Sequence, residues 1–144
     1  MRPDASALLW DARKAVGLIE NFVSGRTWDD YESDSMLRSA VERQFQIIGE
    51  ALNRLSRVDR ETASAVPDLP RIVAFRNVLV HGYSVLDNRL IWEVATLRLA
   101  DLSYALDELL RISDSGHPTP EPWDASTVAR STNPRSFARP ARSG

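Results

Sequence analysis

The chain has 144 residues, 43% hydrophobic and 26% charged, as in an ordinary single globular domain. It contains no cysteine, which excludes disulfides and thiolate metal sites, and its two histidines lie far apart, which disfavours a histidine-based metal site. The formal net charge of −2 creates no global basic field. No apolar run reaches membrane-spanning length and the N-terminus lacks a signal-peptide pattern, so we expect a cytoplasmic protein.

The first predicted element is an amphipathic helix over residues 5–24, ended by Gly25. Its apolar side chains recur at helical spacing: Leu8, Ala12, Ala15, Ile19 and Phe22. Residues 26–34 are polar, acidic and aromatic, and they predict a loop or a short turn. Trp28 and Tyr31 in this segment are interpreted as packing anchors.

The strongest helical pattern covers residues 35–57. Its apolar stripe runs over five turns: Leu37, Val41, Phe45, Ile48, Leu52 and Leu55. Gly49 interrupts this helix and costs about 1 kcal/mol relative to alanine, which predicts the close approach of another helix as compensation. The neighbouring Glu50 is either a solvated or ion-paired surface residue or the polar wall of a groove.

A connector over residues 59–70 follows, with one helical turn expected within 60–66. Pro70 suits the first position of a helix because its missing N–H has no partner there. The next helix is predicted over residues 71–81. Gly82 is predicted to end it in the left-handed conformation, which glycine adopts without a Cβ penalty.

The last predicted helix covers residues 87–112 and carries two apolar rows, so we expect it to pack against two neighbours, one of which could be a second subunit. From residue 113 the composition changes, and the remaining segment holds five of the eight prolines. The sequence therefore predicts a small all-α domain of four main helices over residues 1–112, followed by a tail over residues 113–144 that is extended or disordered.

Four chemically active side chains lie close together in the sequence around the end of the helix predicted over residues 71–81: Arg76, Asn77, His81 and Tyr83. Histidine titrates near neutral pH, so it can act as a base on the 2′-hydroxyl of RNA. A guanidinium can stabilise the charge of the phosphorane-like transition state. Asn77, one turn before His81, could orient the imidazole, and Tyr83 could donate a hydrogen bond or stack on a base.

Arg76 and His81 pose a geometric problem within one helix. Five residues apart, they diverge by roughly 140° at about 100° per residue. They converge only if His81 swings around at a frayed helix end, or if a second copy supplies the complementary residue. The Arg-x4-His spacing alone favours a simpler interpretation, in which these polar groups only cap a helix end.

The residues read together carry more information. The pattern Arg76-Asn77-x-x-x-His81-x-Tyr83 resembles the Arg-x4-His-x-Tyr motif of HepT-like ribonuclease toxins, in the HEPN superfamily. Residues 41–51 resemble the second helix of that family, including its Gly-Glu pair. The connector, the motif helix and the start of the last helix follow in family order, and the resemblance covers about residues 5–112.

The resemblance implies a HEPN-type bundle of four to five helices that dimerises and brings two motifs to one cleft. It implies a metal-independent endoribonuclease without a cofactor, which cleaves transfer RNA or messenger RNA. Arg76 and His81 would be the catalytic pair and Asn77 a supporting residue. It also implies a type VII-like pairing with an MNT-type nucleotidyltransferase antitoxin, which can transfer AMP to Tyr83. The tail departs from the compact family pattern.

Two other functions stay open. The chain could be a non-catalytic HEPN dimer that binds a nucleotide or a nucleotidyltransferase partner. More weakly, it could be a plain helical dimerisation domain in which the motif only caps a helix.

Overall fold

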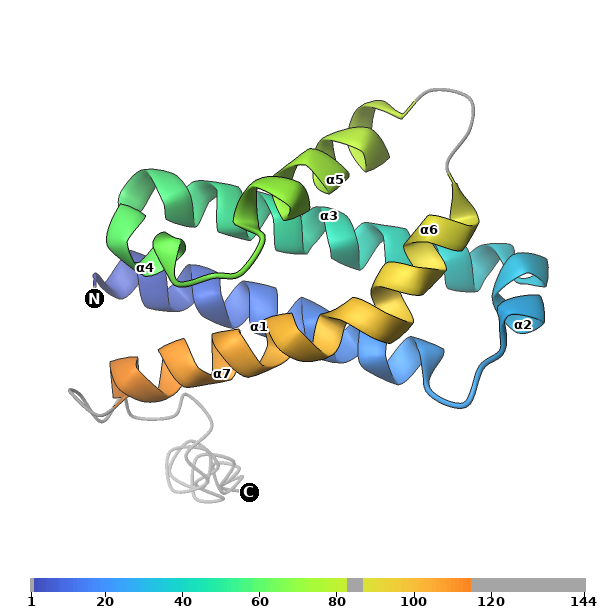
Figure 1. Ribbon diagram of the computed structural model, residues 1–144, viewed down its shortest axis with the longest axis horizontal. Coiled ribbons are helices and arrows are strands. Elements are labelled where there is room, and N and C mark those ends of the chain that lie inside the picture. Colours follow the sequence, from blue (N-terminus) through green and yellow to red (C-terminus); the bar gives the residue numbers. More distant parts are fainter. Residues whose placement is uncertain (1, 83–86, 115–144) are drawn as a thin grey trace, which may run out of the picture.

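The computed structural model describes residues 2–82 and 87–114, and every regular element in these ranges is a helix (Figure 1). In chain order they are α1 (Pro3–Val23), α2 (Trp28–Ser33), α3 (Ser35–Val58), α4 (Arg60–Ser64), α5 (Leu69–His81), α6 (Asn88–Glu93), the π-helical turn η1 (Val94–Arg98) and α7 (Leu99–Asp114). The all-α prediction is confirmed.

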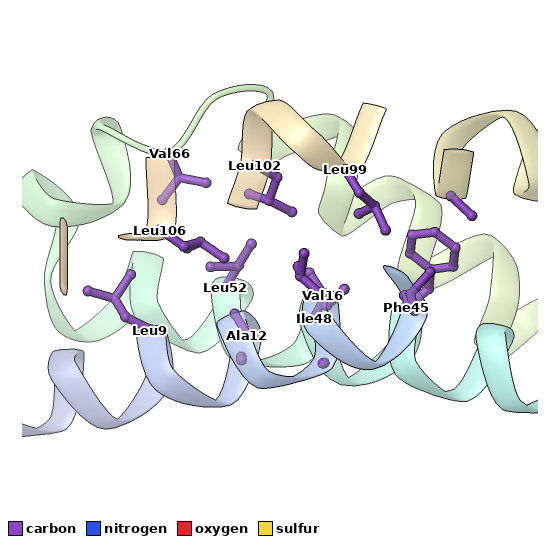
Figure 2. Packing of buried hydrophobic residues seen from close by; sticks show 14 of the residues in the cluster. Leu9, Ala12, Val16, Phe45, Ile48, Leu52, Val66, Leu99, Leu102 and Leu106 are labelled. Atoms are coloured by element: carbon purple, nitrogen blue, oxygen red, sulfur yellow. The ribbon is translucent and has the colours of Figure 1, made fainter. Parts of the chain in front are cut away.

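The hydrophobic core lies where α1 packs against α3 on one side and α7 on the other (Figure 1). Figure 2 shows the interdigitating side chains: Leu9, Ala12 and Val16 of α1, Ile48 and Leu52 of α3, and Leu102 and Leu106 of α7. Full burial of an aliphatic side chain of this size is worth about 1.5–3 kcal/mol, so this layer dominates the stability of the fold. Helix α5 lies outside it and packs on α3 (Figure 1).

Helix α2 forms where a loop or short turn was predicted. A capping box starts it: the Thr27 amide donates to Asp30 Oδ2 at 2.9 Å, and the Asp30 amide donates to Thr27 Oγ1 at 3.2 Å. The hydrogen bond from the Thr27 amide favours the charged carboxylate and lowers the pKa of Asp30. Helix α2 has only six residues, which is too short to show an apolar period. The apolar pattern of the sequence therefore did not predict it.

An aromatic cluster attaches α2 to α6. Tyr31 is fully buried, with its ring centroid 6.2 Å from that of Trp28 and 5.2 Å from that of Trp92. The guanidinium of Arg89 lies 4.9 Å from the centroid of the Trp28 ring, a cation–π contact. The interpretation of Trp28 and Tyr31 as packing anchors is confirmed.

The last predicted helix is present, but a π-helical turn interrupts it and it continues to Asp114. Its buried residues Ile91, Ala95 and Leu99 are spaced by four, and in a regular α-helix each such step would advance the side chain by about 40° around the axis. The wider π-helical turn keeps these residues on one side. The predicted apolar row that starts at Ile91 is buried, whereas in the row that starts at Leu90 Val94 is half-buried and Leu90 and Leu97 are 47% and 75% exposed.

The predicted glycine stop at Gly82 is wrong in its backbone conformation. Helix α5 does end at His81, but Gly82 has φ −68° and ψ 88°, outside the left-handed region. Gly25, after α1, has φ 71° and fits the predicted role. A helix can end without a left-handed residue. A glycine that follows an apolar stripe therefore predicts where the helix ends more reliably than it predicts the backbone conformation of the turn.

The connector contains one short helix, α4, as predicted, and Pro70 lies in the first turn of α5, which begins at Leu69. Among the described helices, none combines the length and the apolar character needed to cross a membrane. The predicted tail over residues 113–144 lies, apart from its first two residues, outside the described ranges.

The hydroxyl of Tyr31 is buried and has no hydrogen-bond partner among the described residues. An unpaired buried polar group is costly, so Tyr31→Phe should raise the free energy of unfolding by about 1 kcal/mol. Urea denaturation checks this, with Tyr104→Phe as the control, because Tyr104 is exposed and its substitution should change little. A Tyr31→Phe protein less stable than the parent would contradict the prediction.

Candidate functional site

The motif helix α5 is attached to the bundle along one face. Leu79 is buried, and Ile72 and Phe75 are half-buried beside it. The ring of Phe75 meets that of Phe45 on α3 edge to face, with centroids 5.1 Å apart and planes at 88°. Such a pair adds about 0.5–1.5 kcal/mol to the area it buries, so it helps to fix α5 on α3.

Arg76 lies on the same side of α5, against Gly49 of α3. A Cβ atom added at Gly49 would lie 2.2 Å from Cβ and 2.6 Å from Cγ of Arg76. The stem of Arg76 therefore occupies the space that any other residue at position 49 would fill. The prediction that another helix approaches closely at Gly49 is confirmed, and the motif arginine is what approaches.

The head of the Arg76 side chain is oriented by its neighbour. Nη1 of Arg76 donates a hydrogen bond to Oδ1 of Asn77 at 2.9 Å. Nε of Arg76 is buried and has no hydrogen-bond partner among the described residues. The guanidinium is thus fixed by a hydrogen bond at one terminal nitrogen, while the side chain as a whole is half-buried.

His81 is the last residue of α5, and it is exposed. The helix is continuous from Arg76 to His81, so the two residues keep the divergence of roughly 140° that ideal helical geometry gives. The first way to bring them together, in which His81 swings off a frayed end, is not what the structure adopts. His81 is exposed, whereas Leu79 on the same helix is buried against the bundle.

Asn77 lies between these two residues around the helix, about 100° from Arg76 and one turn before His81. Its observed hydrogen bond is to Arg76 rather than to the imidazole that the sequence suggested as its partner. The bond draws the guanidinium from the edge of the packed face toward the exposed face that carries His81. Tyr83 lies outside the described residues.

Glu50, next to Gly49, faces a different neighbour. It lines a surface hollow of about 440 Å³ between α1 and α3, together with Asp11, Lys14 and Arg54. Glu50 is exposed, so it is a solvated surface residue that also lines this hollow. The Gly-Glu pair thus directs one residue toward α5 and the next toward α1.

Within residues 2–82 and 87–114, no group of three or more histidine, aspartate or glutamate side chains is arranged to hold a metal ion.

Sequence reasoning identified Gly49 and Arg76 separately but missed that they touch. The signal for Gly49 was a glycine inside a helix of otherwise regular pattern, which indicates an approach without naming the partner. The hydrogen bond between Arg76 and Asn77 was missed for a different reason. Adjacent residues on a helix do not face each other, so only the long, flexible arginine side chain makes it possible.

An all-α bundle with arginine, asparagine and histidine on one short helix is consistent with a HEPN-type domain. The family described as Ribonuclease HepT-like matches residues 12–109, which is most of the chain. The protein belongs to the HepT-like ribonuclease family, as the resemblance of its motif predicted.

Individual relatives agree. A protein of Caldanaerobacter subterraneus subsp. tengcongensis named a candidate RNase is 35% identical over 94 residues, covering 65% of this chain and 82% of the relative. A probable ribonuclease HepT of Thermococcus cleftensis is 27% identical over 103 residues, covering 70% of this chain and 91% of the relative.

A larger relative comes from Methanocaldococcus jannaschii and is named a gamma-glutamylcyclotransferase and candidate RNase. It is 31% identical over 114 residues, but the matched segment covers 79% of this chain and only 50% of that relative. No solved structure gives a significant match to the chain.

Proposed function

We propose that this protein is a metal-independent endoribonuclease, acting in the cytoplasm as the toxin of a type VII-like toxin–antitoxin pair. The observation that carries the proposal is the state of Arg76, whose stem is packed on Gly49 and whose head is oriented by Asn77 on the helix that ends with an exposed His81. Membership of the HepT-like ribonuclease family supports it. Transfer RNA and messenger RNA are both candidate substrates.

The chemistry needs no group beyond those of the motif. A histidine removes the proton from a ribose 2′-hydroxyl, and the oxygen attacks the adjacent phosphorus. The bond from phosphorus to the 5′ oxygen breaks, and a second histidine donates a proton to that oxygen. The products are a 2′,3′-cyclic phosphate and a 5′-hydroxyl end. Arg76 stabilises the negative charge that develops on the phosphorane oxygens.

A second copy of the chain provides the second histidine. In one chain Arg76 and His81 point in different directions, and a symmetric dimer would bring two of each into one cleft. Exposed apolar side chains on α5 and along the α6–η1 segment support such an interface: Val78, Val80, Leu90 and Leu97. Leu90 and Leu97 lie on the last predicted helix, which was expected to pack against two neighbours, one of which could be a second subunit.

The alternative is a non-catalytic HEPN dimer that binds a nucleotide or a nucleotidyltransferase partner through the motif. One terminal nitrogen of Arg76 is already bonded to Asn77, which suits a recognition surface as well as a catalytic one. Tight binding of AMP or of a nucleotidyltransferase, with no cleavage of any RNA, would favour this alternative.

The purified protein should cleave RNA in the presence of EDTA. Arg76→Ala and His81→Ala should each lower the cleavage rate by at least about 10²-fold, because each removes a group that acts in the transition state. Arg71→Ala is the matched control, since Arg71 is an exposed arginine on the same helix outside the motif, and it should retain activity. Full activity of either motif variant, or loss of cleavage in EDTA, would exclude the proposed mechanism.

Mixing the parent protein with His81→Ala tests whether one cleft uses the histidines of both copies. If each cleft needs both His81 side chains, an equal mixture with randomly exchanged subunits contains about one quarter parent dimers, and it shows about a quarter of the rate of the same amount of parent protein. Subunits are exchanged by unfolding and refolding the mixture, and cleavage is measured on labelled RNA. A mixture with half of the parent rate would show that each copy acts with its own histidine alone.

We also propose that an MNT-type nucleotidyltransferase antitoxin neutralises the protein by transferring AMP to Tyr83. The phenolic oxygen attacks the α-phosphorus of ATP, pyrophosphate leaves, and the added phosphate places negative charge beside the motif, where it repels RNA. Tyr83→Phe should keep ribonuclease activity but stay active after incubation with the antitoxin and ATP. Intact mass spectrometry should find one adenylyl group on the parent and none on the variant. Equal modification of both would assign the site to another residue.

A further inference from the structure

We infer that Gly49 is a positioning residue for Arg76, and that the missing side chain at position 49 sets where the guanidinium meets RNA. The inference deepens the proposed function and rests on it. Gly49 itself touches neither RNA nor the reacting atoms, and it acts only through Arg76.

The distances show that the contact between Gly49 and Arg76 leaves no room for a side chain at position 49. Cβ atoms in real structures essentially never approach another heavy atom closer than 3.0 Å, and alanine at position 49 would place its Cβ 2.2 Å from Cβ of Arg76. Cβ of Arg76 cannot rotate away, because its position is set by the backbone of α5. The whole helix would have to move away from α3 to admit one methyl group.

The geometry also explains how the guanidinium is presented. Nε of Arg76 is buried, so RNA can reach only the terminal edge of the group. On that edge Nη1 is bonded to Asn77. Gly49 therefore sets the depth of the arginine and Asn77 sets its direction. A displacement of about 1 Å at such a site can cost about 10²-fold in rate.

A second helical glycine makes the comparison clean. Gly17 lies inside α1, and a Cβ there would meet only Nη1 of Arg13, at 3.3 Å. That atom is the far end of a long side chain whose Nε is bonded to Asp107 at 2.7 Å, and it needs to shift by only a few tenths of an ångström. Both glycines cost helix propensity relative to alanine. Of the two, only Gly49 lies against Cβ and Cγ of a residue on another helix, so only Gly49→Ala should displace that residue.

Gly49→Ala tests the inference. We expect kcat for RNA cleavage to fall by about 10²-fold with little change in KM, because the transition-state contact is displaced while most of the RNA-binding surface stays. Gly17→Ala should keep the parent kcat and raise the melting temperature by a few degrees. A Gly49→Ala protein with the parent kcat would overturn the inference.

Two further measurements do not depend on RNA cleavage. In ¹⁵N spectra, the Nε–H signal of Arg76, identified by its absence in Arg76→Lys, should exchange slowly with solvent in the parent and faster in Gly49→Ala. Gly49→Ala should also lower the melting temperature by about 3–10 °C, as overpacking does in a domain of this size. Arg76→Gly removes the opposing Cβ and Cγ, so in that background Gly49→Ala should not lower the melting temperature. This comparison can be made even if the Gly49→Ala single variant does not fold.

These readouts separate the two proposals. A parent protein that cleaves no RNA, with the expected exchange and melting behaviour, would refute the ribonuclease but keep Gly49 as the residue that positions Arg76. Equal destabilisation by Gly49→Ala in the parent and Arg76→Gly backgrounds would refute the positioning role, whatever the activity.

Discussion

The arrangement of the motif depends on one steric constraint, the close approach of α5 to α3 at Gly49. Helix α5 lies outside the core formed by α1, α3 and α7, and it is held on α3. The edge-to-face pair of Phe45 and Phe75 supplies apolar contact, and one turn along α3 the absence of a side chain at Gly49 lets the stem of Arg76 reach the helix backbone. The aromatic contact stabilises the packing of α5 on α3, whereas the contact at Gly49 fixes how closely the two helices approach.

Helix α5 has one packed side and one exposed side. Leu79 and the stem of Arg76 belong to the side that is packed, and His81 belongs to the side that is exposed. Asn77 connects them by bonding the guanidinium from the exposed side. A single chain therefore offers a rigid arginine and a separate histidine, an arrangement that suits completion by a second copy. The exposed apolar residues of α5 and η1 are compatible with that partner.

Several features followed directly from the amino-acid pattern. The helix over residues 35–57 matches α3 within one residue, because a long apolar stripe of period 3.6 is the most reliable local signal. Helix α2 was missed because six residues are too few to show a period, and the π-helical turn was missed because a step of four can be read as part of a regular α-helix. The turn conformation at Gly82 was wrong because a helix boundary does not determine the backbone angles that follow it.

For this protein, local pattern was sufficient to establish the helical class, the membership of the HepT-like family and the identity of the motif residues on one helix. Each of these depends on spacing along the chain, which periodicity and motif order report directly. The separation of Arg76 from His81 also follows from spacing, because both lie on one continuous helix. The partner of Gly49 was decided by the tertiary structure, because Arg76 is distant from Gly49 in the chain and meets it only when α5 packs on α3. The hydrogen bond between Arg76 and Asn77 is local, but it depends on the side-chain conformation of Arg76, which spacing does not give.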